Sequence, residues 1–213
     1  MSRADLEERI AGRRVVLSLS GGADSAASSL HLYELGIKHE RVFLDTGWEH
    51  ELTYRHLRGE LASKLGPIIE VRPAVPPCDP ASISPDLPLL RAAVERGVFF
   101  VLLCLSKAML PSRVMRFCTS LLKVEPMQRY VRARHDAGEE LLNTVGIRRA
   151  ESDARVNMAE WEWADGFDCE VWRPLVTWSR EDVIEIHKRH GVMPNPLYLR
   201  GAPRGWMART GDD

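Results

Sequence analysis

The stretch Arg14-Val-Val-Leu-Ser-Leu-Ser-Gly-Gly-Ala-Asp-Ser25 decides the fold of this chain. Its first part, residues 14–20, is a short apolar run that contains two adjacent valines, which predicts a buried strand. Gly21 and Gly22 follow directly and predict a tight turn, and a helical pattern then runs from about residue 24 to residue 35. The stretch therefore predicts a strand–turn–helix unit, the first half of a crossover between parallel strands.

The same alternation continues through the next segment of the chain. Residues 41–45 and 67–72 are further strand candidates, and residues 51–65 form a helical pattern between them. Helices of this length between strands indicate a mainly parallel sheet. Prolines between residues 73 and 88 mark a loop, because proline lacks the amide donor that a sheet interior needs.

The second half of the chain has a weaker pattern. The expected elements are a helix over residues 89–110 that is interrupted near Gly97, a helix over residues 125–135, strands over residues 141–147 and 169–172, and a last helix between Ser179 and Gly191. We therefore predict one α/β domain over residues 1–213, with a doubly wound, mostly parallel sheet. Its C-terminal part, from about residue 176, is expected to be a helical and loop appendage and is a candidate for truncation.

Composition excludes several classes of protein. The chain has 213 residues, of which 45% are hydrophobic and 28% charged, as in ordinary globular proteins. A formal net charge of -1 gives no bulk attraction to nucleic acid. The N-terminal residues are polar, and the longest apolar run, residues 98–105, is far shorter than the roughly 20 residues that span a bilayer. We expect a soluble, cytoplasmic protein without a membrane anchor, and the sequence leaves its oligomeric state open.

The turn after the first strand has the features of a phosphate-binding loop. Adjacent glycines let backbone amides approach an anion closely, and the start of the following helix adds free N–H groups. Ser20 and Ser25 can donate hydroxyl hydrogen bonds, and Asp24 either orients the loop or holds a metal ion that bridges phosphates. A strand-to-helix turn with Asp and Ser as capping residues explains the same spacing equally well. Near the other end of the chain, His187 and His190 beside Lys188 predict a solvated, basic helix end.

The turn resembles the Ser-Gly-Gly-x-Asp-Ser signature of the PP-loop ATP pyrophosphatases, the superfamily that includes the PAPS reductases. Walker A and dinucleotide-binding signatures are absent from the sequence. Ala23 stands where many members have lysine, which leaves more of the phosphate charge to arginines. Four further segments are similar, in order, to those of the PAPS reductase-like branch: Phe43-Leu-Asp-Thr-Gly-Trp-Glu49, Arg113-Val-Met-Arg-Phe-Cys-Thr119, Gly146-Ile-Arg-Arg-Ala-Glu-Ser152 and Asn195-Pro-Leu-Tyr198.

The resemblance implies the Rossmann-like adenine nucleotide alpha hydrolase fold, with ATP or a related adenine nucleotide at the point where the strand order reverses. The implied nucleotide-binding residues are Ser18, Ser20, Gly21, Gly22, Asp24, Ser25, Asp45, Thr46, Arg116, Gly146 and Arg155. Asp24, Lys123 and Arg148 are the candidate catalytic residues. Asp24 is also the candidate contact for Mg²⁺.

The activity implied by the resemblance is cleavage of ATP between its α and β phosphates, with adenylation of an acceptor. A sulfur-transfer or nucleic acid modification pathway would supply the acceptor, and so a sulfur donor or a nucleic acid modification protein is the expected partner. Two other functions stay open. One is reduction of a sulfonucleotide with an external thiol, because PAPS reductases use a C-terminal cysteine and the last cysteine here is Cys169. The other is a nucleotide-binding subunit without catalysis.

The four cysteines, Cys78, Cys104, Cys118 and Cys169, are scattered and form no Cys-x-x-Cys pair, which predicts free thiols. Cys104 and Cys169 are expected to be buried and inert. Relatives associated with DNA phosphorothioation carry a Cys-x-x-Cys after the Asn-Pro-Leu-Tyr segment, and that pair would help a residue such as Cys118 to hold an iron–sulfur cluster. Cys118 would be a ligand only if a partner or a missing tail supplied the others. No cluster is therefore expected in this chain.

Overall fold

The computed structural model describes residues 2–112 and 114–199. Contacts within the chain divide it into two compact units. The sheet unit comprises Met1–Phe43, His50–Ile69 and Val131–Asp213, and the helical unit comprises Leu44–Glu49 and Glu70–Tyr130. The single nucleotide-binding domain stays a prediction. Of its C-terminal appendage, residues 200–213 lie outside the described residues.

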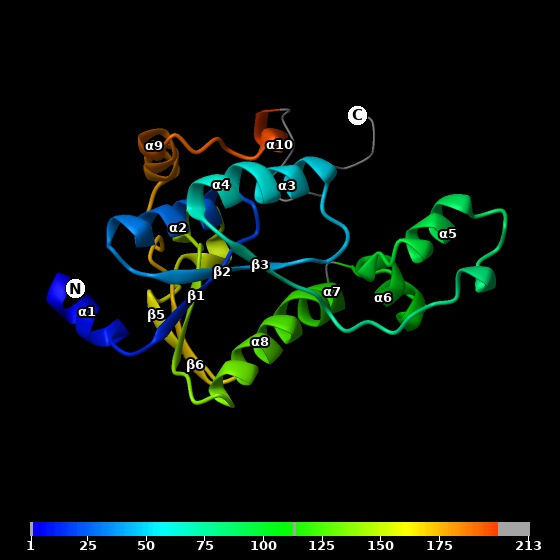
Figure 1. Cartoon of the computed structure of the whole chain (residues 1–213), viewed down its shortest axis with the longest axis horizontal. Helices are drawn as coiled ribbons and strands as arrows, with labels where there is room; N and C mark the ends of the chain where they lie inside the picture. The colour runs from blue at the N-terminus through cyan, green and yellow to red at the C-terminus, as the bar shows by residue number, and fades with distance from the viewer. Residues whose placement is uncertain (1, 113, 200–213) are drawn as a thin grey trace. The chain divides into compact units, whose positions relative to one another are not determined.

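Six strands form one sheet in the order β3-β2-β1-β4-β6-β5 (Figure 1). Their bounds are Arg14–Ser18 (β1), His39–Leu44 (β2), Ile68–Val71 (β3), Leu141–Val145 (β4), Trp161–Ala164 (β5) and Cys169–Trp172 (β6). β1 pairs in parallel with β2 and β4, β4 pairs in parallel with β6, and β5 runs antiparallel to β6. The strand order reverses between β1 and β4, and so the predicted doubly wound, mostly parallel α/β fold is confirmed.

The helices agree with most of the sequence pattern. They are Arg3–Ile10 (α1), Ala23–Glu34 (α2), Glu51–His56 (α3), Ala62–Leu65 (α4), Pro88–Glu95 (α5), Phe99–Lys107 (α6), Phe117–Thr119 (α7), Glu125–His135 (α8), Arg180–His190 (α9) and Pro196–Leu199 (α10). A π-helical turn, Leu57–Leu61, joins α3 to α4, which confirms the helical segment predicted over residues 51–65. No helix in the described part of the chain has the length and apolar character needed to cross a bilayer.

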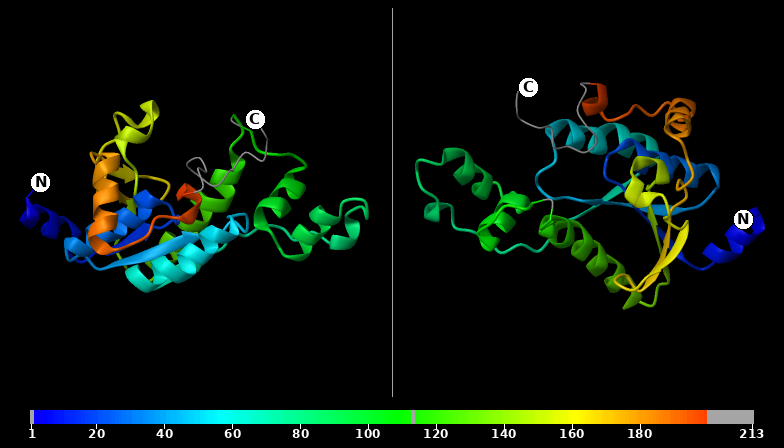
Figure 2. Two further views of the ribbon diagram at one scale, coloured as in Figure 1. Left: turned by 90° about the horizontal axis from the view of Figure 1, so that it is seen from above. Right: turned by 180° about the vertical axis from the view of Figure 1, so that it is seen from behind.

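The core of the sheet unit packs α2 and α9 together with the end of β1. Leu19, Ala27, Leu30 and Ile186 are each no more than 3% exposed and belong to one apolar cluster. Figures 1 and 2 show α9 next to α2, and α3 and α4 on the same side of the sheet. Burying a side chain of this size stabilises the fold by about 1.5–3 kcal/mol. Because α2 is fixed against the sheet, the turn that joins it to β1 has a defined position.

The helical unit has a smaller core of its own. Val94, Val98, Val101 and Leu102 are buried in one apolar cluster that α5 and α6 share. Gly97 lies between these helices with φ of +66°, a conformation that favours glycine. The predicted interruption of the helix near Gly97 is therefore confirmed.

The strand β5 is an element that the sequence pattern did not predict. Its two tryptophans differ in exposure: Trp161 stacks on Trp172 at 4.9 Å between ring centroids, and Trp163 is 57% exposed. The guanidinium of Arg9 lies 4.1 Å from the centre of the Trp161 ring. A strand of four residues is too short for a clear alternation, and its position depends on packing against β6 and α1.

His187 is buried, and so the prediction of a solvated helix end is wrong at this position. Its Nε2 lies 2.9 Å from the carbonyl oxygen of Ala23, and its Nδ1 lies 3.1 Å from that of Val192. The local basic sequence misled the prediction because the packing of α9 on α2 decides which side chains of α9 are covered. His190, one turn further along, contacts Glu34 at the partly exposed end of the helix.

Glu34 joins the C-terminal ends of α2 and α9. It accepts a hydrogen bond of 2.8 Å from Arg189 Nε and lies 2.7 Å from His190 Nε2. The hydrogen bond from Arg189 is the largest cause that lowers the pKa of Glu34 from its ordinary value of 4.5 to about 2. A lowered pKa in the folded state stabilises the fold above pH 4.5, and this stabilisation is lost as the pH falls toward 2.

Glu34→Gln should therefore lower the urea midpoint at pH 7, and the difference from the unaltered protein should shrink steadily below pH 4.5. Glu185→Gln is the matched control, because Glu185 is 76% exposed and lies 3.9 Å from the same arginine. We expect the control to leave the midpoint unchanged. Urea titrations from pH 7 to pH 3 would contradict this account if the effect of Glu34→Gln were the same at every pH.

Candidate functional site

The turn between β1 and α2 is closed by hydrogen bonds among its own residues. The amide of Ser20 donates to Ser25 Oγ at 3.2 Å, and Ser25 Oγ donates to the carbonyl of Gly22 at 3.0 Å. Gly21 has φ of +78°, and a Cβ placed on it would lie 3.1 Å from side-chain carbons of Thr53 and Leu57. Both the backbone conformation and the space available therefore require glycine at position 21.

The first turn of α2 carries backbone amides that its N-cap residue cannot satisfy. That residue is Gly22, which has no side chain to accept a hydrogen bond. Unsatisfied amides and the helix dipole give a helix N-terminus roughly half a positive charge, which favours an anion. The hydroxyls of Ser20 and Ser25 lie in the same turn, 3.2 Å apart. The turn has the donors needed to hold a phosphate or sulfate group.

A buried ion pair joins this turn to the segment that follows β4. Arg148 Nε donates to Asp24 Oδ1 at 2.6 Å, and the side chains are 2% and 22% exposed. The predicted catalytic residues Asp24 and Arg148 are thus brought together. This contact ties Asp24 to a segment outside the turn, and the role of Asp24 in orienting the turn stays a prediction. The role of Asp24 as a Mg²⁺ contact stays a prediction.

Arg148 also lies within electrostatic reach of the start of α9. The pKa of Asp182 is lowered, chiefly by hydrogen bonds from Ser179 and to a smaller extent by the positive charge of Arg148. Ser179 and Asp182 form a capping box at the start of α9. The buried guanidinium therefore pairs with the start of α2 and acts electrostatically on the start of α9.

Gly146 provides close contact between the segment after β4 and α2. A Cβ placed on Gly146 would lie 2.7 Å from the carbonyl oxygen of Asp24 and 2.8 Å from Ser28 Oγ. Beyond Arg148, the guanidinium of Arg155 pairs with the carboxylate of Glu151, which also accepts the amide of Arg148. Arg155 thus pairs with a residue of its own segment. Its contact with a nucleotide stays a prediction.

Asn195 and Thr53 are site residues to which the sequence assigned no role. Asn195 is 6% exposed and its side chain donates to the carbonyl of Gly21 at 3.2 Å and to Thr53 Oγ1 at 3.1 Å. The similarity of the Asn195-Pro-Leu-Tyr198 segment to the family pattern was the available signal. The similarity could not show that this segment contacts the turn through Asn195.

Five of the predicted residues belong to the helical unit: Asp45, Thr46, Arg116, Cys118 and Lys123. Their convergence with the turn stays a prediction. Within that unit, Asp45 Oδ1 accepts the amide of Gly47 at 2.9 Å, and Arg72 Nε lies 3.5 Å from Asp45 Oδ2. Asp45 is therefore held by its own turn, as a capping carboxylate would be.

Glu49 is a further carboxylate of the helical unit that sequence reasoning did not single out. Thr46 Oγ1 donates to Glu49 at 3.4 Å, and Lys123 Nζ lies 3.9 Å from the same oxygen. Burial is the largest cause that raises the pKa of Glu49, and the positive charge of Lys123 partly offsets it. Lys123 and Thr46 are thus brought together around Glu49, within a single unit.

All four cysteines are free, as predicted. Cys104 and Cys169 are buried, and burial raises the pKa of both thiols, so they are poor nucleophiles at neutral pH. Within residues 2–112 and 114–199, no three His, Cys, Asp or Glu side chains are grouped so that they could hold a metal ion. That no iron–sulfur cluster forms in this chain stays a prediction.

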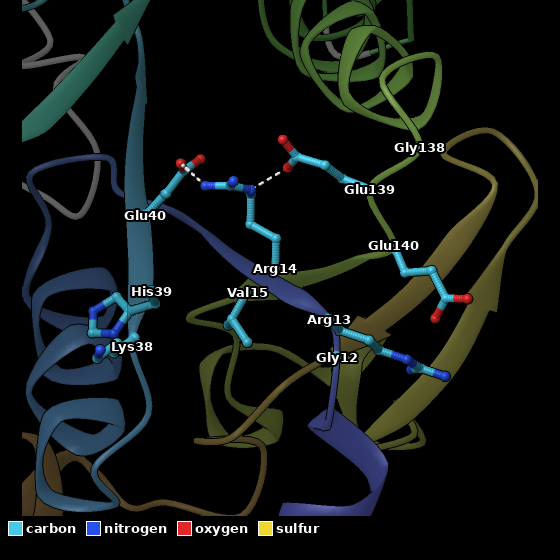
Figure 3. A pocket seen from close by; sticks show the side chains of 10 residues that line it. All are labelled: Gly12, Arg13, Arg14, Val15, Lys38, His39, Glu40, Gly138, Glu139 and Glu140. Carbon is cyan, nitrogen blue, oxygen red and sulfur yellow. Dashed lines mark hydrogen bonds and ion pairs between the residues drawn. The ribbon is translucent and has the colours of Figure 1, made fainter.

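A separate concave region lies at the opposite end of β1 (Figure 3). It has a volume of about 860 Å³ and is lined by residues 12–15, 38–40 and 138–140. Figure 3 shows the guanidinium of Arg14 between the carboxylates of Glu40 and Glu139. Ligands of open α/β sheets bind at the carboxyl ends of the strands, whereas this region lies at their amino ends. Its paired charges also argue against an anion site.

Gly146→Ala should lower the free energy of unfolding by about 1–3 kcal/mol, because the added methyl would overlap the backbone of Asp24. Gly59→Ala is the matched control, since no atom lies within 4 Å of a Cβ at that position. We expect the control to keep or raise stability. Urea unfolding measures both variants, and an unchanged stability of Gly146→Ala would contradict the close contact described above.

Parts of the chain are similar in sequence to known proteins. A family model for the phosphoadenosine phosphosulfate reductase domain matches residues 105–208. An uncharacterized 37.8 kDa protein in the gpa 5' region of Escherichia phage 186 is 34% identical over 215 residues, which is 89% of this chain and 64% of that protein. The adenosine 5'-phosphosulfate reductase of Streptomyces coelicolor is 34% identical over 84 residues, 39% of this chain and 33% of the reductase. The chain thus spans less than two thirds of either relative.

Solved structures show the same fold. The phosphoadenylyl-sulfate (PAPS) reductase from Candida auris, in a phosphate complex, has a TM-score of 0.64 at 18% identity, over 99% of this chain and 91% of that one. The FMN adenylyltransferase of Candida glabrata, in complex with FAD and inorganic pyrophosphate, has a TM-score of 0.59 at 12% identity, over 96% of this chain and 58% of that one. The family model, the relatives and the fold thus agree with the resemblance that the sequence motifs indicated. Residues 105–208, just under half of the chain, thus match the phosphoadenosine phosphosulfate reductase domain family, and the solved structures show that the fold of the chain is similar to that of a PAPS reductase.

Proposed function

We propose that this protein binds ATP by its phosphates at the turn of residues 18–25 and cleaves it between the α and β phosphates. The observation that carries the proposal is the start of α2. The N-cap residue there is a glycine, which has no side chain to accept hydrogen bonds from the first-turn amides, and so these amides can donate to a bound anion. The buried guanidinium of Arg148 lies next to them. This position is also where the strand order of the sheet reverses, the usual ligand position in such folds.

Such a reaction needs mainly positioning and charge neutralisation. The amides after Gly22 and the hydroxyls of Ser20 and Ser25 hold phosphate oxygens in this proposal, and Arg148, oriented by Asp24, neutralises their charge. An oxygen of the acceptor attacks the α phosphorus. The bond from that phosphorus to the α,β-bridging oxygen then breaks, and pyrophosphate leaves with the electron pair.

The remaining predicted residues stay candidates for contacts to the same nucleotide. Asp45, Thr46, Arg116, Lys123 and Arg155 would contact the rest of the nucleotide, and Mg²⁺ would accompany its phosphates. Support for pyrophosphate as the product comes from an adenylyltransferase of similar fold whose structure holds FAD and inorganic pyrophosphate. A sulfur donor or a nucleic acid modification protein remains the proposed partner, in the cytoplasm.

A sulfonucleotide is the second candidate substrate, because adenosine 5'-phosphosulfate reductases are among the relatives, at 32–34% identity over part of the chain. Reduction needs a thiolate that attacks sulfur. Cys104 and Cys169 are buried with raised thiol pKa, and so another protein would have to supply the thiol. Nucleotide binding without catalysis is the third candidate.

Incubation with ATP and Mg²⁺ should release pyrophosphate, and Arg148→Lys should lower kcat/KM about 100-fold, because the single nitrogen of lysine cannot contact Asp24 and a phosphate oxygen in the way that a guanidinium can. The matched control is Arg149→Lys, since Arg149 Nε bonds the carbonyl of Met158, away from the turn. Its rate should stay near that of the unaltered protein. Thermal melting of both variants separates loss of activity from loss of structure.

Other reaction products would support a different function. Sulfite released from PAPS or adenosine 5'-phosphosulfate with added thioredoxin, without pyrophosphate from ATP, would replace ATP cleavage by sulfonucleotide reduction. Tight ATP binding with neither product would leave a nucleotide-binding subunit. Equal loss of activity in the two arginine variants would contradict the role of Arg148.

A further inference from the structure

The amide of Asn195 makes three hydrogen bonds that the proposed chemistry does not use. Its Nδ2 donates to the carbonyl of Gly21 at 3.2 Å and to Thr53 Oγ1 at 3.1 Å, and its Oδ1 accepts the amide of Leu197 at 3.0 Å. Asn195 and Thr53 are 6% and 4% exposed. Three segments that are distant in sequence therefore meet at one buried side chain: the turn, α3 and the residues before α10.

These partners fix the orientation of the Asn195 amide. The backbone N–H of Leu197 can bond only to an acceptor, which must be Oδ1, and the carbonyl of Gly21 can bond only to a donor, which must be Nδ2. A rotated amide would lose both bonds. The side chain is thus held in a single arrangement that places a donor against the turn.

The bond to Gly21 sets the direction of a whole peptide plane. In a trans peptide, the carbonyl of one residue and the N–H of the next point in opposite directions. Because Asn195 holds the carbonyl of Gly21 from one side, the amide of Gly22 is directed to the other, where Ser20 Oγ accepts it at 3.4 Å. Gly21 has φ of +78°, a conformation that glycine adopts freely, and so the hydrogen bond from Asn195 is what restricts the neighbouring peptide plane.

The same segment also approaches the next residue of the turn. A Cβ placed on Gly22 would lie 3.3 Å from the hydroxyl oxygen of Tyr198. Asn195 and Tyr198 therefore contact consecutive residues of the turn, one by a hydrogen bond and one by close packing. The segment supports the turn at the residues that come directly before the first-turn amides of α2.

We propose that Asn195 is a positioning residue for the phosphate subsite. By holding the peptide plane between Gly21 and Gly22, it aims the donors of the turn and of the first turn of α2 at the anion. The inference rests on the proposed binding of a nucleotide by its phosphates, and it assigns the role of support to the Asn195-Pro-Leu-Tyr198 segment. Its ligand class is a nucleotide with a phosphate chain, not the nucleoside alone.

Asn195→Asp tests the role with a substitution of nearly equal size. It replaces the donor Nδ2 by an oxygen that faces the carbonyl oxygen of Gly21, so attraction becomes repulsion. We expect ATP affinity, measured by calorimetry, to weaken about tenfold while adenosine affinity stays unchanged, because adenosine has no phosphates. The control Asn157→Asp makes the same change at an exposed position and should alter neither affinity.

The acceptor Thr53 supplies an independent pair of variants should Asn195→Asp fail to fold. Thr53→Val removes the hydroxyl but leaves the bond between Asn195 and Gly21, and should weaken ATP binding by less than Asn195→Asp. Thr53→Ser keeps the hydroxyl and should restore the affinity of the unaltered protein. Equal ATP affinities in the Val and Ser variants would then overturn the inference.

Other outcomes separate this inference from the proposed function. Equal weakening of ATP and adenosine binding in Asn195→Asp would show a general structural role and overturn the inference. Unchanged ATP affinity in that variant would overturn it while leaving the proposed function intact. An unaltered protein that binds adenosine but gains nothing from the phosphates of ATP would overturn both.

Discussion

The buried ion pair between Asp24 and Arg148 is the interaction on which the site depends. It joins the turn after β1 to the segment after β4, the two neighbouring strands between which the strand order reverses. Breaking a buried pair of this kind leaves an uncompensated charge and costs about 3–5 kcal/mol. Because the guanidinium is 2% exposed, its charge is largely protected from solvent screening and acts strongly on whatever lies at the turn.

The turn is held by side chains from several directions. Arg148 contacts the carboxylate of Asp24, His187 contacts the carbonyl of Ala23, and Asn195 contacts the carbonyl of Gly21. Each of the three is less than 10% exposed and comes from a segment more than a hundred residues away in sequence. A turn fixed in this way needs little ordering when an anion binds, which preserves affinity. The fold thus places rigid donors at the strand reversal.

The local sequence was sufficient to predict some elements of the fold and of the site, but not the contacts between distant segments. The strand, glycine turn and helix over residues 14–35 depend on short-range preferences, and so their pattern predicts them well. The strand β5 was not predicted because its four residues are too few to show a periodic pattern. The burial of His187 was not predicted because it depends on the packing of α9 against α2. Resemblance to a family pointed to Asp24 and Arg148 but not to their mutual contact, nor to the support of Gly21 by Asn195. Such contacts arise only from the assembled fold.

The central claim, that the turn binds the phosphates of a nucleotide, is tested most directly by the backbone amide NMR signals of the protein during titration with ATP and Mg²⁺. The account predicts that the largest shifts occur at the amides of residues 20–25, with a smaller response in the segment that follows β4. It also predicts no response around Arg14, at the opposite end of the strand. Unchanged signals at Gly21, Gly22 and Asp24 at saturating ATP would contradict it.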